Sequence, residues 1–356
     1  MALTGRLWAV LLVASATGAL AQVPPDIAAQ NRTLGARIDV PAAIRTYAAV
    51  EERPPYREVR IRRDIAYGAD PRYRLDVFAP RRPERRALPV VIFATGGDFT
   101  RRIDLPGGAP FYDNVVLWAA KHGLIGVNTD RRYFRGRPWQ TGPEDMAAMI
   151  GWVHAHIRDY GGDPERIVFL GHAFGGTQLV SYLAHPQYWC CHGPGIAAAV
   201  ILSAPLNLPP ATSAPLTPGV VGVTGHAPHA AGANPLFDPR HSDLGGLSHI
   251  TIPVFIGSAQ LEGVQQQQSA RVLQQQLCAL GRCPTFREFA DHNHLSVMFS
   301  FNTADRSVSG PVLRWIEARG AQSSGSAVSS TTRRSTKLVC TPVTPSIRVM
   351  RFSSSC

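Results

Sequence analysis

The sequence predicts a single α/β domain whose central sheet is mostly parallel and covered by helices on both faces. Three observations support this prediction. A run of apolar residues at 88–94 ends at two glycines, which is typical of a buried central strand. Further short apolar runs alternate with longer helical segments, and this alternation is typical of parallel sheets. One of the strands, 166–170, leads directly into a glycine-rich turn and a helix.

The expected elements follow this alternation through most of the chain. Antiparallel strands come first, at 59–61 and 73–78, because their residues alternate apolar with polar. Later strands are expected at 88–94, 124–128, 166–170, 196–203, 252–256 and 285–290. Helices are expected at 112–121, 143–160, 174–185, 264–280 and 312–318. We therefore place the folded domain at 58–319 and treat residues 22–57 as a polar, Pro-punctuated N-terminal lead-in with little structure.

The first 21 residues have the pattern of a secretory signal peptide. Arg6 gives a positive start, residues 7–20 are apolar, and Ala19 to Ala21 form an A-x-A cleavage site. A membrane span needs about 20 apolar residues, so no stable membrane anchor is expected. We expect an exported protein, periplasmic or secreted, with the signal cleaved after Ala21. Export implies an oxidising compartment, in which Cys278 and Cys283 could close a small loop.

The formal net charge of +11 at first suggests nucleic acid as a partner. The distribution of charge argues against this, because the arginines of 57–86 are scattered and no recognition module accompanies them. Residues 320–356 contain no acidic side chain and are rich in Ser and Thr. They are expected to form a disordered, basic tail. No nucleic-acid partner is predicted, and the oligomeric state stays open.

Residues 207–247 interrupt the alternation and are rich in Pro, Gly, Ala and His. A connection of this length is expected as an insertion or lid-like loop over the carboxyl edge of the sheet, where binding loops usually lie. Its histidines, in it or beside it, are His226, His229, His241 and His249. Their spacing matches no standard metal site, so surface histidines are the favoured interpretation. No metal is predicted.

The strongest functional pattern is the turn after strand 166–170, where Gly171, Gly175 and Gly176 surround Ala173. A G-x-S-x-G turn between a strand and a helix presents a nucleophilic serine on strained backbone. Side chains at its glycine positions would clash with the strand or the helix. The glycines and the context are present here, but the serine position holds Ala173. Because a glycine pattern alone is weak, the interpretation depends on the rest of the site.

The rest of the site would come from the ends of three other strands. Gly96 and Gly97 follow strand 88–94, and their backbone N–H groups, with that of Phe174, are expected to form an oxyanion hole. Glu262 follows strand 252–256 and is the candidate acid that orients a histidine. The plainer alternatives are a simple strand-end turn at 95–97 and a solvated loop glutamate at Glu262.

Two histidines after strand 285–290 are candidates for the general base. His292 and His294 both lie in the segment where an imidazole can reach back to the turn. The chain order of turn, acid and histidine is the order that a nucleophile-elbow enzyme of this kind requires.

These segments together resemble the carboxylesterase and lipase-type serine hydrolases of the α/β-hydrolase superfamily. The likeness is greatest to exported bacterial members with an H-G-G oxyanion loop, a G-x-S-A-G elbow and a G-H-N-H-x-S histidine loop. It runs from about residue 64 to 316, and the residues that carry it are Asp64 to Gly68, Leu75 to Val77, Thr95 to Gly97, Tyr160 to Ile167, Gly171 to Gly176, Ala259 to Glu262 and His292 to Ser296. The resemblance implies an α/β-hydrolase fold, an ester substrate, no cofactor, and His294 rather than His292 as the base.

Three departures from the family pattern matter. Thr95 stands where the family has histidine, which a hole made of backbone donors can tolerate. Glu262 replaces the usual aspartate, an exchange that this fold accepts. Ala173 replaces serine and has no nucleophilic atom, a loss that costs about 10⁶ in turnover in subtilisin. No substitute nucleophile is expected from Ser181, Ser203 or His172.

Two classes of function therefore stay open. The first is a carboxylic-ester hydrolase scaffold for small-molecule esters, inactive or severely impaired because of Ala173. The second is a non-catalytic pseudoenzyme that binds a ligand or a partner. The alanine has three explanations: a deliberate Ser-to-Ala exchange, a natural pseudoenzyme or a decaying gene. The retained Glu262 and His294 favour descent from, or engineering of, an active enzyme.

Overall fold

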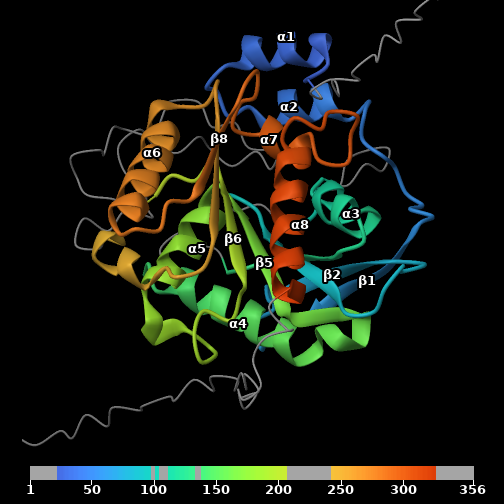
Figure 1. Ribbon diagram of the computed structural model, residues 1–356. Helices are drawn as coiled ribbons and strands as arrows, with labels where there is room; N and C mark the ends of the chain where they lie inside the picture. Colours follow the sequence, from blue (N-terminus) through green and yellow to red (C-terminus); the bar gives the residue numbers. More distant parts are fainter. Residues whose placement is uncertain (1–21, 98–100, 104–110, 133–137, 207–241, 326–356) are drawn as a thin grey trace, which may run out of the picture.

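An eight-stranded sheet forms the centre of the molecule (Figure 1). The computed structural model describes residues 22–97, 101–103, 111–132, 138–206 and 242–325. The strand order is β1-β2-β4-β3-β5-β6-β7-β8. The strands are β1 (Val59–Ala66), β2 (Arg74–Pro80), β3 (Leu88–Ala94), β4 (Ile125–Thr129), β5 (Gly162–His172), β6 (Ala198–Leu202), β7 (Val254–Ala259) and β8 (Thr285–Phe289).

The sheet is mostly parallel, as the sequence predicts. The pairs β1–β2 and β2–β4 are antiparallel, and the five other pairs are parallel. The carboxyl ends of β3, β5, β6, β7 and β8 therefore meet at one edge of the sheet. The glycine-rich turn, the Gly96–Gly97 segment and the segments with Glu262 and His294 all follow these ends.

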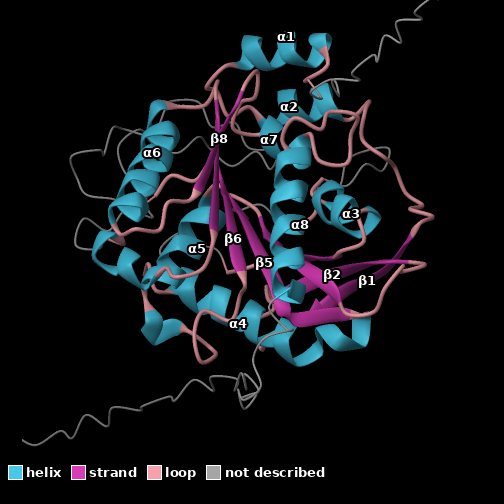
Figure 2. Cartoon of the chain, viewed as in Figure 1, coloured by secondary structure: helices cyan, strands magenta, loops and turns pink. Residues whose placement is uncertain are grey.

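Helices cover both faces of the sheet (Figure 2). One face is covered by α4 (Thr141–His156), α5 (Phe174–Ala184) and α6 (Val264–Ala279), and the other by α3 (Asp113–Lys121) and α8 (Ser309–Gly325). Because successive strand side chains point to opposite faces, Ile92 joins the core under α4–α6 and Phe93 the core under α3 and α8. Short 3₁₀ turns lie at Ile157–Tyr160, Pro186–Tyr188 and Leu244–His249.

The expectation of little structure in residues 22–57 was wrong. This segment forms α1 (Pro25–Leu34) and α2 (Val40–Tyr47), each with proline in its first turn. Both helices join the core on the α3 and α8 side, and they lie near α7 (Ser296–Phe299) in Figure 1. The Tyr47 and Phe299 rings pack edge to face, with centroids 6.0 Å apart. The N-terminal helices thus cover the segment that follows the two candidate histidines.

The C-terminal boundary also differs from the expectation. Helix α8 continues to Gly325, so residues 320–325, which we assigned to a disordered tail, are helical. The predicted signal peptide, most of the 207–247 insertion with His226, His229 and His241, and the tail beyond 325 lie outside the described residues. Within the described ranges, no helix is long and apolar enough to cross a membrane.

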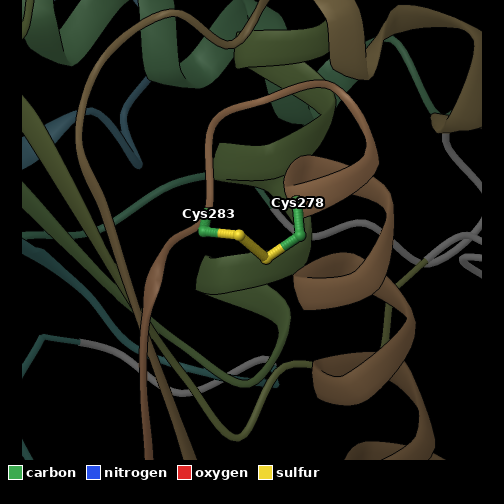
Figure 3. Close-up of a disulfide and its surroundings, with 2 residues drawn as sticks. All are labelled: Cys278 and Cys283. Carbon is green, nitrogen blue, oxygen red and sulfur yellow. A yellow bond between two sulfur atoms is a disulfide. The ribbon is translucent and has the colours of Figure 1, made fainter.

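A disulfide joins Cys278, near the end of α6, to Cys283, which precedes β8 (Figure 3). The bond agrees with the expectation from the sequence that these two cysteines could close a small loop. The bond holds the turn between α6 and β8, and β8 leads to the histidine segment.

Candidate active site

Ala173 lies in a strained turn between β5 and α5. Its φ is 49° and its ψ is −123°, a conformation that side-chain-bearing residues rarely adopt. The Ala173 N–H donates to Leu202 O at 3.0 Å, and Ala173 O accepts the N–H of Thr177 at 3.0 Å. These bonds fix the turn between the end of β6 and the first turn of α5. The strand–turn–helix geometry that the G-x-S-x-G pattern requires is therefore present.

The glycines of this turn are steric requirements. A Cβ on Gly175 would lie 2.2 Å from Ala94 O, and one on Gly171 would lie 2.7 Å from the backbone of Gly176. At Gly176, an added Cβ would come within 2.8 Å of the Ala204 side chain. Real Cβ atoms do not approach so closely, so helix α5 can begin this near to β3 and β5 only because these positions are glycine.

The Gly96–Gly97 segment lies directly against Ala173. A Cβ on Gly96 would lie 2.4 Å from the Ala173 Cβ, and Gly97 has a positive φ of 59°. The structure thus brings together two of the segments that the sequence predicts for an oxyanion hole, and Phe174 is the next residue after Ala173. Bare backbone this close to the Ala173 side chain is what a backbone-donor site requires.

A buried network of ion pairs and hydrogen bonds holds Gly97 and Arg101. Arg101 Nε donates to Asp76 Oδ1 at 2.9 Å, and the Arg101 guanidinium also pairs with Asp130. Asn128 Nδ2 donates to Arg101 O at 2.6 Å, and Arg131 Nη2 donates to Gly97 O at 3.0 Å. Gly97 and Arg101 are therefore tied to the end of β4. These contacts could not be predicted from the sequence, because ion-pair partners this far apart in sequence carry no local pattern.

Nearby donors keep the buried Asp76 carboxyl ionised. Burial alone would raise the pKa of Asp76. The Asp64 backbone N–H and the Arg63 and Arg101 guanidinium groups together outweigh it, so the pKa of Asp76 is below its ordinary value.

Glu262 and His294 face each other near this edge of the sheet. Both are buried, and Glu262 Oε2 lies 3.6 Å from His294 Nδ1. These two atoms have no hydrogen-bond partner among the described residues. The separation exceeds a hydrogen bond, but catalytic pairs are often longer before substrate binds.

Ser258 fixes the other oxygen of Glu262. Its Oγ donates to Glu262 Oε1 at 2.8 Å, and the Ala259 N–H donates to the same oxygen at 3.0 Å. One carboxylate oxygen is thus held while the other is directed at the imidazole. Sequence reasoning missed this role of Ser258, although its position four residues before the acid was the available signal.

His172 links the turn to the histidine segment. Its Nε2 lies 2.8 Å from His294 O, and the two rings are 4.9 Å apart. A carbonyl only accepts, so Nε2 carries the proton and Nδ1 is unprotonated. Burial, followed by the charge of the His294 ring, holds the pKa of His172 well below 6.5. His172 is therefore neutral and fixes the backbone of His294, a contact across 122 residues that the sequence did not reveal.

His292 is engaged elsewhere. Its Nδ1 lies 2.9 Å from Ser296 Oγ, its Nε2 lies 2.7 Å from Ser307 Oγ, and Asp305 is 3.4 Å away. Burial lowers the pKa of His292, although Asp305 opposes this. Both ring nitrogens thus hold the loops behind the site. Of the two candidate histidines, His294 is the one placed beside Glu262.

Ser181 and Ser203 are the two serines that the sequence analysis considered as substitute nucleophiles. Ser181 Oγ donates to Asp243 Oδ2 at 2.8 Å and so points away from the turn. Ser203 is buried at the end of β6 with a φ of 51°.

In the described part of the chain, no group of three or more His, Cys, Asp or Glu side chains could hold a metal ion. His249, beside the insertion, has its Nδ1 3.1 Å from Ala184 O.

Sequence comparison links the central part of the chain to esterases. The BD-FAE family model matches residues 75–186, from β2 past the glycine-rich turn. Fumonisin B1 esterase of Sphingopyxis macrogoltabida is 28% identical over 145 residues, which is 37% of this chain and 26% of the relative. A probable isoprenylcysteine alpha-carbonyl methylesterase of Oryza sativa subsp. japonica is 34% identical over 124 residues, 35% of this chain and 28% of the relative. The matches span about a quarter of these relatives' own length.

Solved structures with the same fold cover far more of the chain. Esterase B from Lactobacillus rhamnosis aligns with a TM-score of 0.58 and 13% identity over 80% of this chain and 93% of its own. A bacterial heroin esterase aligns with a TM-score of 0.57 and 17% identity over 84% and 98%. At such identities the likeness concerns the fold, and it confirms the predicted architecture.

Proposed function

We propose that this chain is an α/β-hydrolase of the carboxylesterase and lipase type and that it carries an ester-hydrolase site disabled at a single atom. One observation carries the proposal. Ala173 occupies the strained turn between β5 and α5 with the Gly96 segment against its side chain, while the Glu262–His294 pair is retained. The missing atom is the serine oxygen.

The roles of the other residues follow from the chemistry of acyl transfer. With serine at 173, His294 would take the hydroxyl proton as the oxygen attacks the ester carbonyl, then give it to the leaving alcohol. Water would then hydrolyse the acyl-enzyme with the same base. Glu262 would hold the imidazole and stabilise its charge. The amides of Gly96, Gly97 and Phe174 would stabilise the oxyanion.

Ala173 removes the first of these steps. His294 has no hydroxyl proton to abstract, and no acyl-enzyme can form. An oxyanion hole and a binding site alone retain about 10³–10⁴-fold acceleration over water in serine proteases. The chain as it stands is therefore proposed to be inactive or severely impaired.

The second candidate is a pseudoenzyme that binds an ester-like ligand without turning it over. The observation that favours it is Ala173 itself, since the residues packed against it are retained. In this case a carbonyl ligand would bind the wild-type chain reversibly and leave it unmodified. The acyl and alcohol groups of the ligand are not specified by the described residues.

Assays on the wild type, Ala173→Ser and Ala173→Gly test the proposal. We expect covalent labelling by a fluorophosphonate probe and hydrolysis of short-chain p-nitrophenyl esters by Ala173→Ser alone. Glycine is the matched control, because it changes the turn without adding a nucleophile. Inactivity of a folded Ala173→Ser protein would refute the site. Equal activity of all three would mean that another nucleophile acts, and Ser203→Ala would then be examined.

We further propose that the protein is exported, periplasmic or secreted, with cleavage after Ala21. The disulfide between Cys278 and Cys283 supports this, because disulfides persist mainly in oxidising compartments. N-terminal sequencing of the protein from periplasm and medium tests it. A mature protein that begins at Met1 and stays in the cytoplasm would contradict the proposal.

A further inference from the structure

A cavity of about 380 Å³ lies at the opposite end of the sheet from Ala173. Leu88 and Gly162, the first residues of β3 and β5, line it, whereas the glycine-rich turn follows the last residue of β5. Ligand sites commonly have volumes of about 300–1,000 Å³. The cavity is therefore large enough for a small molecule and separate from the proposed ester-hydrolase site.

Four arginines from three separate segments line this cavity. They are Arg60 on β1, Arg85 and Arg86 in the β2–β3 connection, and Arg158 in the 3₁₀ turn after α4. A single lining carboxylate, Asp163, accompanies them, and its Oδ1 already accepts the N–H of Glu165 at 3.0 Å. The fold thus gathers positive charge that is distant in sequence.

These four guanidinium groups have no ion-pair partner in the part of the chain that the structure describes. Other arginines behave differently, since Arg63, Arg101 and Arg132 each pair with buried aspartates. All four side chains around the cavity are exposed, so their donors are accessible to an anion from solvent. A bound anion would use these donors.

The remaining lining is largely apolar. Its accessible part includes Pro83, Ala87 and Tyr160, above the buried Leu88 and Ile125. Guanidinium groups match carboxylate and phosphate oxygens with paired donors, and apolar side chains favour a hydrocarbon or aromatic body. The ligand that fits both features is therefore an anion with an apolar part.

We propose that this cavity binds a small organic anion, a carboxylate or phosphate monoester with a short apolar or aromatic group. Its charged end contacts Arg60, Arg85, Arg86 and Arg158, and its apolar end lies on Pro83 and Tyr160. The site is independent of the nucleophile position, so binding does not require serine at 173.

Isothermal titration calorimetry with phenyl phosphate and phenylacetate tests the proposal on the wild-type chain. We expect saturable 1:1 binding by at least one of them, and weaker binding by inorganic phosphate, which lacks the apolar part. Benzyl alcohol, which lacks the charge, should not bind. The double variant Arg85→Ser/Arg158→Ser should bind about ten- to a hundredfold more weakly, as expected for lost hydrogen bonds to a charged group. Raising the salt concentration should weaken binding by the wild type.

The matched control is Arg45→Ser/Arg287→Ser, which removes two exposed arginines that lie outside the cavity. It should bind like the wild type. Absence of saturable binding to the wild type, or an equal loss in both double variants, would overturn the proposal. Should the first double variant fail to fold, Arg60→Gln alone decides, by the same titration. Binding is measured without ester turnover, so failure here and failure of the proposed ester-hydrolase function are separate results.

Discussion

Replacing Gly175 by alanine should destabilise the protein strongly, because helix α5 begins against the end of β3. The new Cβ would lie 2.2 Å from Ala94 O, 2.8 Å from Ala94 C and 2.8 Å from Thr95 O. These are backbone atoms of a buried strand and its turn, so no side chain can rotate away. Overpacking of this kind costs about 1–3 kcal/mol, and we expect about 3 kcal/mol here because the contact with the oxygen must open to at least 3.0 Å.

Urea unfolding measures this loss as a lower midpoint at unchanged slope. The control is Gly245→Ala, an exposed glycine in the Leu244–His249 turn whose added Cβ would meet nothing within 4 Å. It should change the free energy of unfolding by less than about 1 kcal/mol. If Gly175→Ala unfolds at the same urea concentration as the wild type, the tight contact between α5 and β3 is wrong, and the argument for a glycine-dependent elbow fails.

Three further predictions concern the histidine side of the site. The pKa of His172 is well below 6.5 in the folded state. As the pH is lowered below about 6.5, His172 is protonated in the unfolded chain but not in the folded one, so the free energy of unfolding decreases by up to about 1.4 kcal/mol per pH unit. Urea titrations from pH 7 to 5 should show a shallower fall for His172→Asn, and parallel curves would contradict this. In an Ala173→Ser background, Glu262→Gln should lower kcat by up to about 10⁴, since an amide does not stabilise the imidazolium; an unchanged kcat would remove Glu262 from its role. Asn31→Ala should cost about 1–3 kcal/mol in urea unfolding, because Asn31 Nδ2 donates to Asp291 O at 3.0 Å and holds α1 against the histidine segment.

The central sheet could be predicted from the sequence because its signal is local. The run at 88–94 became β3 with the same bounds, since a strand buried on both faces is apolar throughout. The N-terminal helices could not be predicted in this way. They have 10 and 8 residues, and helices this short depend on tertiary contacts such as Tyr47 with Phe299. The prolines of this segment suggested irregular structure, although proline is favoured in the first turn of a helix.

The candidate site shows the same division. Ala173, Glu262 and His294 could be placed because each follows a strand, and parallel strands deliver their carboxyl ends to one edge. His172 could not be assigned, because its partner is a backbone carbonyl, which any residue at 294 would supply. The contacts of Asp130 with the Arg101 backbone N–H and of Arg131 with Gly97 O could not be predicted either. Side chains that bind distant backbone leave no spacing in the sequence.

The backbone at position 173 supports a site built to present a side chain. Holding a residue with a Cβ at φ 49° and ψ −123° costs about 1–3 kcal/mol that glycine would largely avoid. For folding alone, glycine would therefore be the better residue in this turn, as it is at Gly171, Gly175 and Gly176. A Cβ is needed there only if a side chain must extend from the turn toward the Gly96 segment. Ala173 keeps that Cβ and its strain and lacks one oxygen, so the geometry of the turn, rather than the chemistry of alanine, supports the proposed serine-hydrolase site.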